Sequence, residues 1–241
     1  MRITGGRTVY GQDLGILMLD TVFPRLPGDV GNARTWPFPV RYQVVDGAVP
    51  GRIMGTEPDP TVLEPFIEAA RQLERDGVRA ITTSCGFLAI YQAELAAAVE
   101  VPVLSSALLQ VPLVAAQLGG RPVGILTERD DLTERHFAGA GFSASSTPVV
   151  VRAFDEDAVF PHVFIGNRLE ADADELTREM VALARALVDE HPDVGAIVCE
   201  CTNFVPFSQA MREATGLPVY DLHTLVTGVM TATRGHVFPR P

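Results

Sequence analysis

Cysteine, aromatic residues and long apolar runs are all scarce in this sequence. It has three cysteines and 7% aromatic residues. The apolar runs at 14–19 and 122–126 are far shorter than the ~20 residues that span a bilayer. Three thiols are too few, and odd in number, for a disulfide framework, and the five scattered histidines do not give zinc-site spacing. We therefore expect no membrane span and no metal site.

Basic residues are also outnumbered, which limits the partners of the protein. The formal net charge is −11, so the surface repels phosphate backbones and nucleic acid is not expected as a partner. A pocket can still bind a small anion through helix N-termini and backbone N–H groups. Residues 1–9 lack the apolar stretch of a secretory signal, which favours a cytoplasmic location. No glycine-rich phosphate loop follows a strand, so we expect no nucleotide cofactor.

Apolar residues make up 47% of the chain and charged residues 20%, as in soluble globular proteins. Strand-like and helix-like runs alternate, which is typical of α/β proteins with parallel sheets. The expected strands cover 14–19, 39–45, 80–84, 102–105, 123–127, 148–154, 195–200 and 218–222. The expected helices cover 64–76, 88–99, a run ending at 118, 131–140, 172–190, 206–214 and 224–233.

The second half of the sequence repeats the first. A shift of 116 positions places Cys85 on Cys201, Ala80 on Ala196 and Pro102 on Pro218, and strands and helices fall in step. We predict an α/β fold of two similar parallel-sheet subdomains related by internal duplication, with an active-site cleft between them. The predicted subdomains are 1–112 plus 217–241, which contains Cys85, and 113–216, which contains Cys201.

Cys85 and Cys201 each follow a strand and precede a helix, at the sheet edge where α/β proteins bind ligands. A free thiol has a pKa of about 8.5, and we expect the helix N-terminus to lower it. Two thiols facing each other across a cleft could move protons on opposite faces of one carbon. The alternatives are inert buried cysteines and a redox-switch disulfide. Cys199 lies inside a strand, where core packing is the better interpretation.

The chain resembles the aspartate/glutamate racemase superfamily, in an uncharacterised branch. The resemblance is carried by an early Gly-x-x-x-x-Asp-Thr segment that starts at Gly15, by the cysteine motifs at 82–87 and 198–203, and by the duplicated architecture. It implies a cofactor-independent enzyme, often a homodimer, with its active site between two subdomains and two cysteine bases. The expected catalytic residues are thus Cys85 and Cys201. The expected substrate-binding residues are Asp20, Thr21, Thr83, Ser84, Gly86, Phe87, Thr202, Asn203 and His223.

The predicted function is racemisation or epimerisation at the α-carbon of an amino-acid-like or other small carboxylate. Glutamate is not the favoured substrate. Glutamate racemases follow the first cysteine with Asn-Thr and the second with Thr-His, where this chain has Gly86-Phe87 and Thr202-Asn203. One alternative is an enzyme like maleate isomerase or arylmalonate decarboxylase, with one cysteine as nucleophile or proton donor. The other is a non-catalytic protein that binds small acids.

A long loop at 24–39 follows the first strand and lies on the predicted ligand-binding edge. Arg25 or Arg34 could pair with a substrate carboxylate, although a solvent or dimer contact is the favoured interpretation. Trp36 and Phe38 fit a lid or subunit interface and ordinary core packing equally well. Asp130-Asp131 is interpreted as a helix N-cap.

Overall fold

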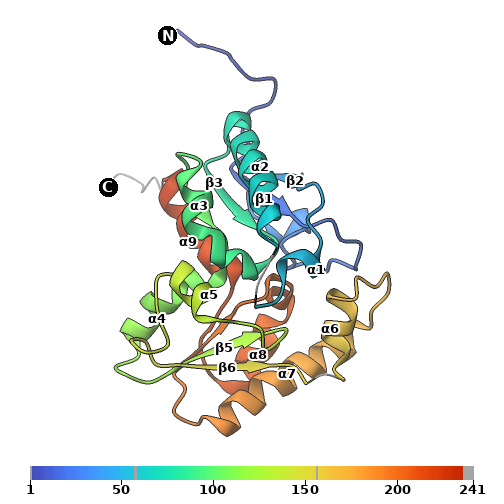
Figure 1. The fold of residues 1–241 in the computed structure, drawn as a ribbon, viewed down its shortest axis with the longest axis vertical. Coiled ribbons are helices and arrows are strands. Elements are labelled where there is room, and N and C mark those ends of the chain that lie inside the picture. Colours follow the sequence, from blue (N-terminus) through green and yellow to red (C-terminus); the bar gives the residue numbers. More distant parts are fainter. Residues whose placement is uncertain (1, 57–58, 156, 236–241) are drawn as a thin grey trace, which may run out of the picture.

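Two four-stranded parallel sheets form the framework of the computed structural model, which describes residues 2–56, 59–155 and 157–235. The strand orders are β2-β1-β3-β4 and β6-β5-β7-β8. Leu14 in the first sheet pairs with Val40 and Ala80, and Val123 in the second pairs with Val149 and Ala196. The two halves thus share strand order and register, which confirms the predicted fold class and duplication. Figure 1 shows them one above the other.

The elements follow the expected alternation of strands and helices. The strands are β1 Leu14–Met18, β2 Val40–Val44, β3 Ala80–Thr83, β4 Val103–Leu104, β5 Val123–Thr127, β6 Val149–Ala153, β7 Ala196–Cys199 and β8 Val219–Tyr220. The α-helices are α1 Pro50–Ile53, α2 Leu63–Asp76, α3 Gln92–Ala97, α4 Val111–Gln117, α5 Glu134–Gly139, α6 Val159–Phe164, α7 Ala173–Glu190, α8 Ser208–Thr215 and α9 Leu222–Arg234. Short 3₁₀ segments are η1 Ala33–Thr35, η2 Pro60–Val62, η3 Gly86–Tyr91, η4 Ala107–Gln110 and η5 Thr202–Phe207.

The central strands of each sheet are buried on both faces. Every residue of β1, β3, β5 and β7 is buried, whereas β2 and β6 at the sheet edges are only partly covered. Parallel strands covered by helices on both faces are expected to be buried along their whole length in this way. One apolar cluster contains both Ile16 and Ile125, so the two halves share a core.

The predicted helix ends agree with the structure where a single residue determines the end. Helix α2 ends at Gly77, whose φ of 95° is the left-handed conformation that favours glycine at this position. Helix α7 begins after Asp172, whose side chain accepts hydrogen bonds from two backbone N–H groups. The interpretation of Asp130-Asp131 as a cap is wrong, because Thr133 caps α5 in a capping box and Asp131 pairs with Arg129.

Two segments depart from the predicted helices. The expected helix at 88–99 is divided into η3 and α3, and the one at 206–214 begins only at Ser208 because η5 precedes it. Helix α6 and the short helix α1 were not predicted, and Figure 1 shows them on the same side of the molecule.

The last helix contacts the first half of the chain. Arg234, at the end of α9, pairs with Asp13, and Arg79 donates to the backbone oxygen of Thr233. The subdomain boundaries stay a prediction, and residues 1 and 236–241 of the predicted ranges lie outside the described residues. Among the helices described, none combines the length and the apolar composition needed to cross a membrane.

Candidate active site

A pocket lies between the two halves, at the carboxyl ends of the central strands. This is the edge where open α/β sheets bind ligands. The first half contributes Leu19, Thr21, Phe23, Arg25, Pro50, Met54, Ser84, Cys85, Gly86 and Phe87. The second half contributes Glu128, Phe164, Ile165, Glu200, Cys201 and Asn203.

Cys85 and Cys201 lie in this one pocket on walls from opposite halves. Cys85 follows β3 and precedes η3, and Cys201 follows β7 and precedes η5. Both thiols are buried and free. Backbone N–H groups of Phe87 and Leu88 face the sulfur of Cys85, and that of Asn203 faces Cys201. The sequence repeat thus brings the two thiols to a common site.

The expected lowering of the thiol pKa values is wrong. Burial raises the pKa of Cys85, and the nearby carboxyl of Glu200 raises it further. Burial also raises the pKa of Cys201 well above its usual value, followed by the effects of Glu128 and Glu200. The backbone N–H groups of two short 3₁₀ segments oppose this effect but are outweighed by desolvation.

Two carboxyls that were not among the predicted site residues, Glu128 and Glu200, lie near Cys201. Cys201 Sγ donates a hydrogen bond to Glu128 Oε2 at 3.0 Å, and Thr127 Oγ1 donates to Glu200 Oε2 at 2.8 Å. Both carboxyls are almost fully buried. Burial raises the pKa of Glu128 to about 8 and that of Glu200 to about 7. Each of the two glutamates directly follows a central strand at the ligand-binding edge, and this position is the sequence feature that could have identified them as site residues.

The predicted polar residues divide between lining the pocket and supporting it. Ser84 and Asn203 line it, and Asn203 Oδ1 is buried without a hydrogen-bond partner. Thr202 does not line it, because its hydroxyl donates to the backbone oxygen of Ser84 at 2.9 Å and so connects the halves. Thr83 is fully buried, and its hydroxyl donates to the backbone oxygen of Ser105.

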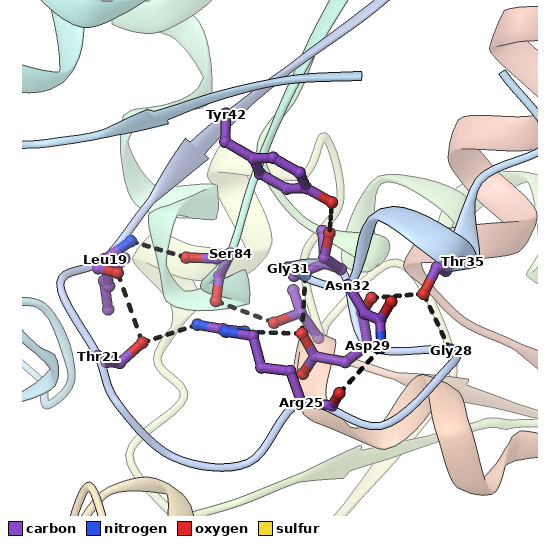
Figure 2. A network of polar contacts seen from close by, with 12 residues as sticks. Leu19, Thr21, Arg25, Gly28, Asp29, Gly31, Asn32, Thr35, Tyr42 and Ser84 are labelled. Atoms are coloured by element: carbon purple, nitrogen blue, oxygen red, sulfur yellow. Dashed lines mark hydrogen bonds and ion pairs between the residues drawn. The ribbon is translucent and has the colours of Figure 1, made fainter. Parts of the chain in front are cut away.

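Arg25 in the 24–39 loop lines the pocket and is held by two side chains (Figure 2). Its guanidinium donates to Asp29 Oδ1 and to Thr21 Oγ1, each at 2.7 Å. It also lies over the ring of Phe23, 4.5 Å from the centroid. Asp29 is buried, so this ion pair fixes the position of the arginine. Arg34, the other candidate in the loop, does not line the pocket.

Two further predicted site residues, Asp20 and His223, also do not line the pocket. Asp20 is exposed and precedes Thr21, which does line the pocket. His223 stacks on Trp36 with ring centroids 5.5 Å apart, and Trp36 in turn stacks on Phe38. Trp36 and Phe38 are buried in the shared core, which supports the core-packing interpretation over a lid.

Contacts between the halves also close the pocket on the side of α6. The rings of Phe23 and Phe164 meet edge to face at 4.9 Å, and the backbone N–H of Val22 donates to Asn167 Oδ1 at 2.7 Å. Phe160, Val163 and Phe164 recur at helical spacing, and this signal could have identified α6. Within the described residues, no group of three or more His, Cys, Asp or Glu side chains could hold a metal ion.

Comparison with protein families and relatives gives two kinds of match. The family model described as Asp/Glu/Hydantoin racemase matches residues 37–227. A dimethylsulfoniopropionate lyase of Durusdinium sp. clade D is 33% identical over 214 residues, covering 86% of this chain and 70% of the relative. Dimethylsulfoniopropionate lyase 3 of Emiliania huxleyi is 30% identical, and there the match covers 91% of this chain but 59% of the relative.

Solved structures share the fold at low sequence identity. A crystal structure of arylmalonate decarboxylase has a TM-score of 0.60 and 16% identity, with 95% of this chain and 96% of that chain covered. Glutamate racemase from Francisella tularensis, in complex with D-glutamate, has a TM-score of 0.55 and 13% identity, with 92% and 80% covered. These similarities establish the two-sheet architecture.

Proposed function

Given that this chain belongs to the Asp/Glu/hydantoin racemase family, we propose that it is a lyase that eliminates a sulfonium group from a small carboxylate. Dimethylsulfoniopropionate is the proposed substrate, with dimethyl sulfide and acrylate as products. The names of the two lyase relatives support this substrate.

The observation that carries the proposal is the uneven charge of the pocket. One arginine, already paired with Asp29, lines the pocket together with two buried carboxyls, Glu128 and Glu200. Phe23, Phe87 and Phe164 also line the pocket. A cation that enters would favour the ionised form of the carboxyls and would bind to the faces of the phenyl rings. A sulfonium group fits this side, where a second substrate carboxylate would be repelled.

The carboxylate of the substrate fits the side formed by the first half. Arg25 and the hydroxyls of Thr21 and Ser84 line this side, and the guanidinium is the strongest anion-binding group among them. Backbone N–H groups that follow Cys85 add donors near the same place. A substrate with a carboxylate at one end and an onium group two carbons away would thus be bound at both ends.

The chemistry needs one base and a good leaving group. A cysteine thiolate takes the proton from the carbon next to the carboxylate, and the C–H electrons form the new C=C bond. The C–S bond breaks with its electrons moving to sulfur, which leaves as neutral dimethyl sulfide. Hydrogen-bond donors around the carboxylate stabilise the negative charge that develops on it during this step.

The proposal is tested by supplying dimethylsulfoniopropionate to the parent protein, Cys85→Ser, Cys201→Ser and Cys199→Ser. Acrylate is followed by NMR and dimethyl sulfide in the headspace. Cys199 is buried in β7 outside the pocket, so its variant is the matched control and is expected to keep activity. Loss of both products in Cys201→Ser, by at least about 10²-fold as expected for a general base, would support the proposal. Absence of products from the parent would overturn it.

Racemisation or epimerisation of a small carboxylate is the second candidate, favoured by the two thiols on opposite walls. The two reactions differ in what happens to the proton. A racemase gives a proton back to the same carbon, whereas the lyase leaves an alkene. A panel of chiral amino and hydroxy acids in D₂O would show α-deuterium incorporation in the first case alone.

A further inference from the structure

The two halves of the fold differ at the positions of the two carboxyls beside Cys201. By strand register, β5 corresponds to β1 with a shift of 109 positions and β7 to β3 with a shift of 116. Glu128 therefore corresponds to Leu19, and Glu200 corresponds to Ser84. The backbone agrees, because Ser84 N donates to Leu17 O and Glu200 N donates to Leu126 O. Leu19 and Ser84 thus stand in the first half at the positions that the two acids occupy in the second half.

Glu128 also lies on the wall between the pocket and the outside of the protein. Together with Ile165 it lines the pocket on one side and a surface depression on the other. Polar groups around that depression are Arg129, Asp130, Asp131, Asp155 and His162. One carboxyl oxygen of Glu128 accepts from Cys201, and the other is buried without a partner. A single side chain therefore connects the thiol to a polar, solvent-facing surface.

We propose that Glu128 accepts the thiol proton of Cys201 and passes it to the surface depression, which makes Cys201 the base and Glu128 its positioning residue. This inference rests on the proposed elimination. The zwitterionic substrate gives neutral dimethyl sulfide, the acrylate anion and one proton. A racemase returns its proton to the substrate, but this reaction produces a proton that has to leave the pocket.

The protons balance over one cycle. Cys201 thiol and Glu128 carboxylate exchange a proton to give the thiolate and the carboxylic acid. The thiolate then takes the α-proton of the substrate while the C–S bond breaks. Cys201 is again a thiol, and Glu128 holds the extra proton, which it releases through the depression. No proton from Cys85 is needed in this cycle, because dimethyl sulfide leaves as a neutral molecule without taking one up.

Charged groups from both halves of the chain lie around Cys201 and Glu128. Within the pocket they are Glu200, which raises the pKa of both Glu128 and Cys201, and Arg25, which is paired with Asp29. In the depression Asp131 is paired with Arg129, and Asp155 with Arg152. Asp130 and His162 are the remaining titratable groups around the depression.

The test compares Glu128→Gln with Glu200→Gln in the full chain. The readout is the pH dependence of iodoacetamide alkylation at each cysteine, resolved by peptide mass spectrometry, together with the pH profile of turnover. Glu128→Gln removes the proton acceptor, so turnover of dimethylsulfoniopropionate should fall at least about tenfold. Because Glu128 and Glu200 both raise the pKa of Cys201, the Cys201 alkylation profile should move to lower pH in each variant. Cys85 should move in the same direction by a smaller amount in Glu128→Gln, because Glu128 is a minor cause of its raised pKa.

Glu128→Asp keeps the carboxyl on a shorter side chain and should keep part of the turnover, which keeps the test usable if the glutamine variant unfolds. Turnover of Glu128→Gln within about twofold of the parent would overturn the proposal. A turnover loss with an unchanged Cys201 alkylation profile would also overturn it, because Glu128 would then not act through Cys201. Alkylation needs no substrate, so it measures the coupling of Glu128 and Cys201 independently of the lyase. Acrylate formation at the parent rate in Glu128→Gln would refute Glu128 and leave the lyase intact, whereas no acrylate from the parent would refute the lyase.

Discussion

Gly86 lies directly against Glu200 across the boundary between the two halves. A Cβ atom placed on Gly86 would overlap the backbone oxygen and Oε1 of Glu200. Gly86 also follows Cys85, so the close approach brings the backbone beside one thiol against the carboxyl that precedes the other. The position therefore requires glycine because of the space available.

We predict that Gly86→Ala destabilises the protein by about 1–3 kcal/mol, the usual cost of overpacking, and lowers turnover by displacing Glu200. Gly228→Ala is the matched control, because nothing lies within 4 Å of a Cβ at this exposed position in α9. Alanine there should leave stability equal or raise it by up to about 1 kcal/mol. Urea unfolding measures both variants, and equal stability of the two would contradict the close contact.

The Arg25–Asp29 pair should behave as a buried unit. Asp29 is 2% exposed, so Arg25→Ala leaves a buried carboxylate without its partner and should cost about 3–5 kcal/mol. Asp29→Asn introduced into that variant should recover much of the loss. A double-mutant cycle by urea unfolding measures the coupling. Additive effects of the two substitutions would show that the pair is not coupled.

Glu128 and Glu200 should make the folded protein less stable as the pH rises. Their pKa values are raised to about 8 and about 7, so the folded state holds protons that the unfolded state loses near 4.5. Stability from this source is complete below about pH 4.5 and is lost as the pH rises through 7 and 8. The free energy of unfolding is measured at pH 5.5 and 8.5 for the parent and for the double variant Glu128→Gln/Glu200→Gln. Relative to the double variant, the parent should be less stable at pH 8.5 than at pH 5.5. A constant difference would refute the shifted values.

His136 should act in the opposite direction at low pH. It is fully buried, its ring meets Phe87 edge-on, and burial lowers its pKa to about 4. The unfolded chain therefore binds a proton near pH 6.5 that the folded protein resists, and stability falls as the pH drops from 6.5 towards 4. His136→Gln keeps the capping box with Thr133 and should lose stability less steeply over that range. Parallel stability curves for the two proteins would contradict this prediction.

The parts of the fold that depend on local pattern could be predicted from the sequence. Continuous apolar runs give the central strands, and Gly77 and Asp172 define helix ends through their own backbone and side-chain chemistry. The repeat brought Cys85 and Cys201 to one pocket because residues at equivalent strand ends meet at the same sheet edge.

The parts that depend on long-range packing could not be predicted in this way. Glu128 and Glu200 are two of 30 acidic residues, and only the three-dimensional structure distinguishes buried ones from exposed ones. Burial also reverses the expected direction of the cysteine pKa shifts. His223 corresponds to Ala107 in the repeat but stacks on Trp36, which comes from the 24–39 loop, whereas the equivalent connection of the second half contains α5.

The most direct test of the proposed function is a ¹H NMR time course of the parent protein with dimethylsulfoniopropionate in D₂O. If the protein is this lyase, the two methylene signals of the substrate decay while the vinyl signals of acrylate appear, with one acid equivalent released for each acrylate. Unchanged methylene signals, together with α-deuterium incorporation into a chiral amino or hydroxy acid, would contradict the lyase and support the racemase.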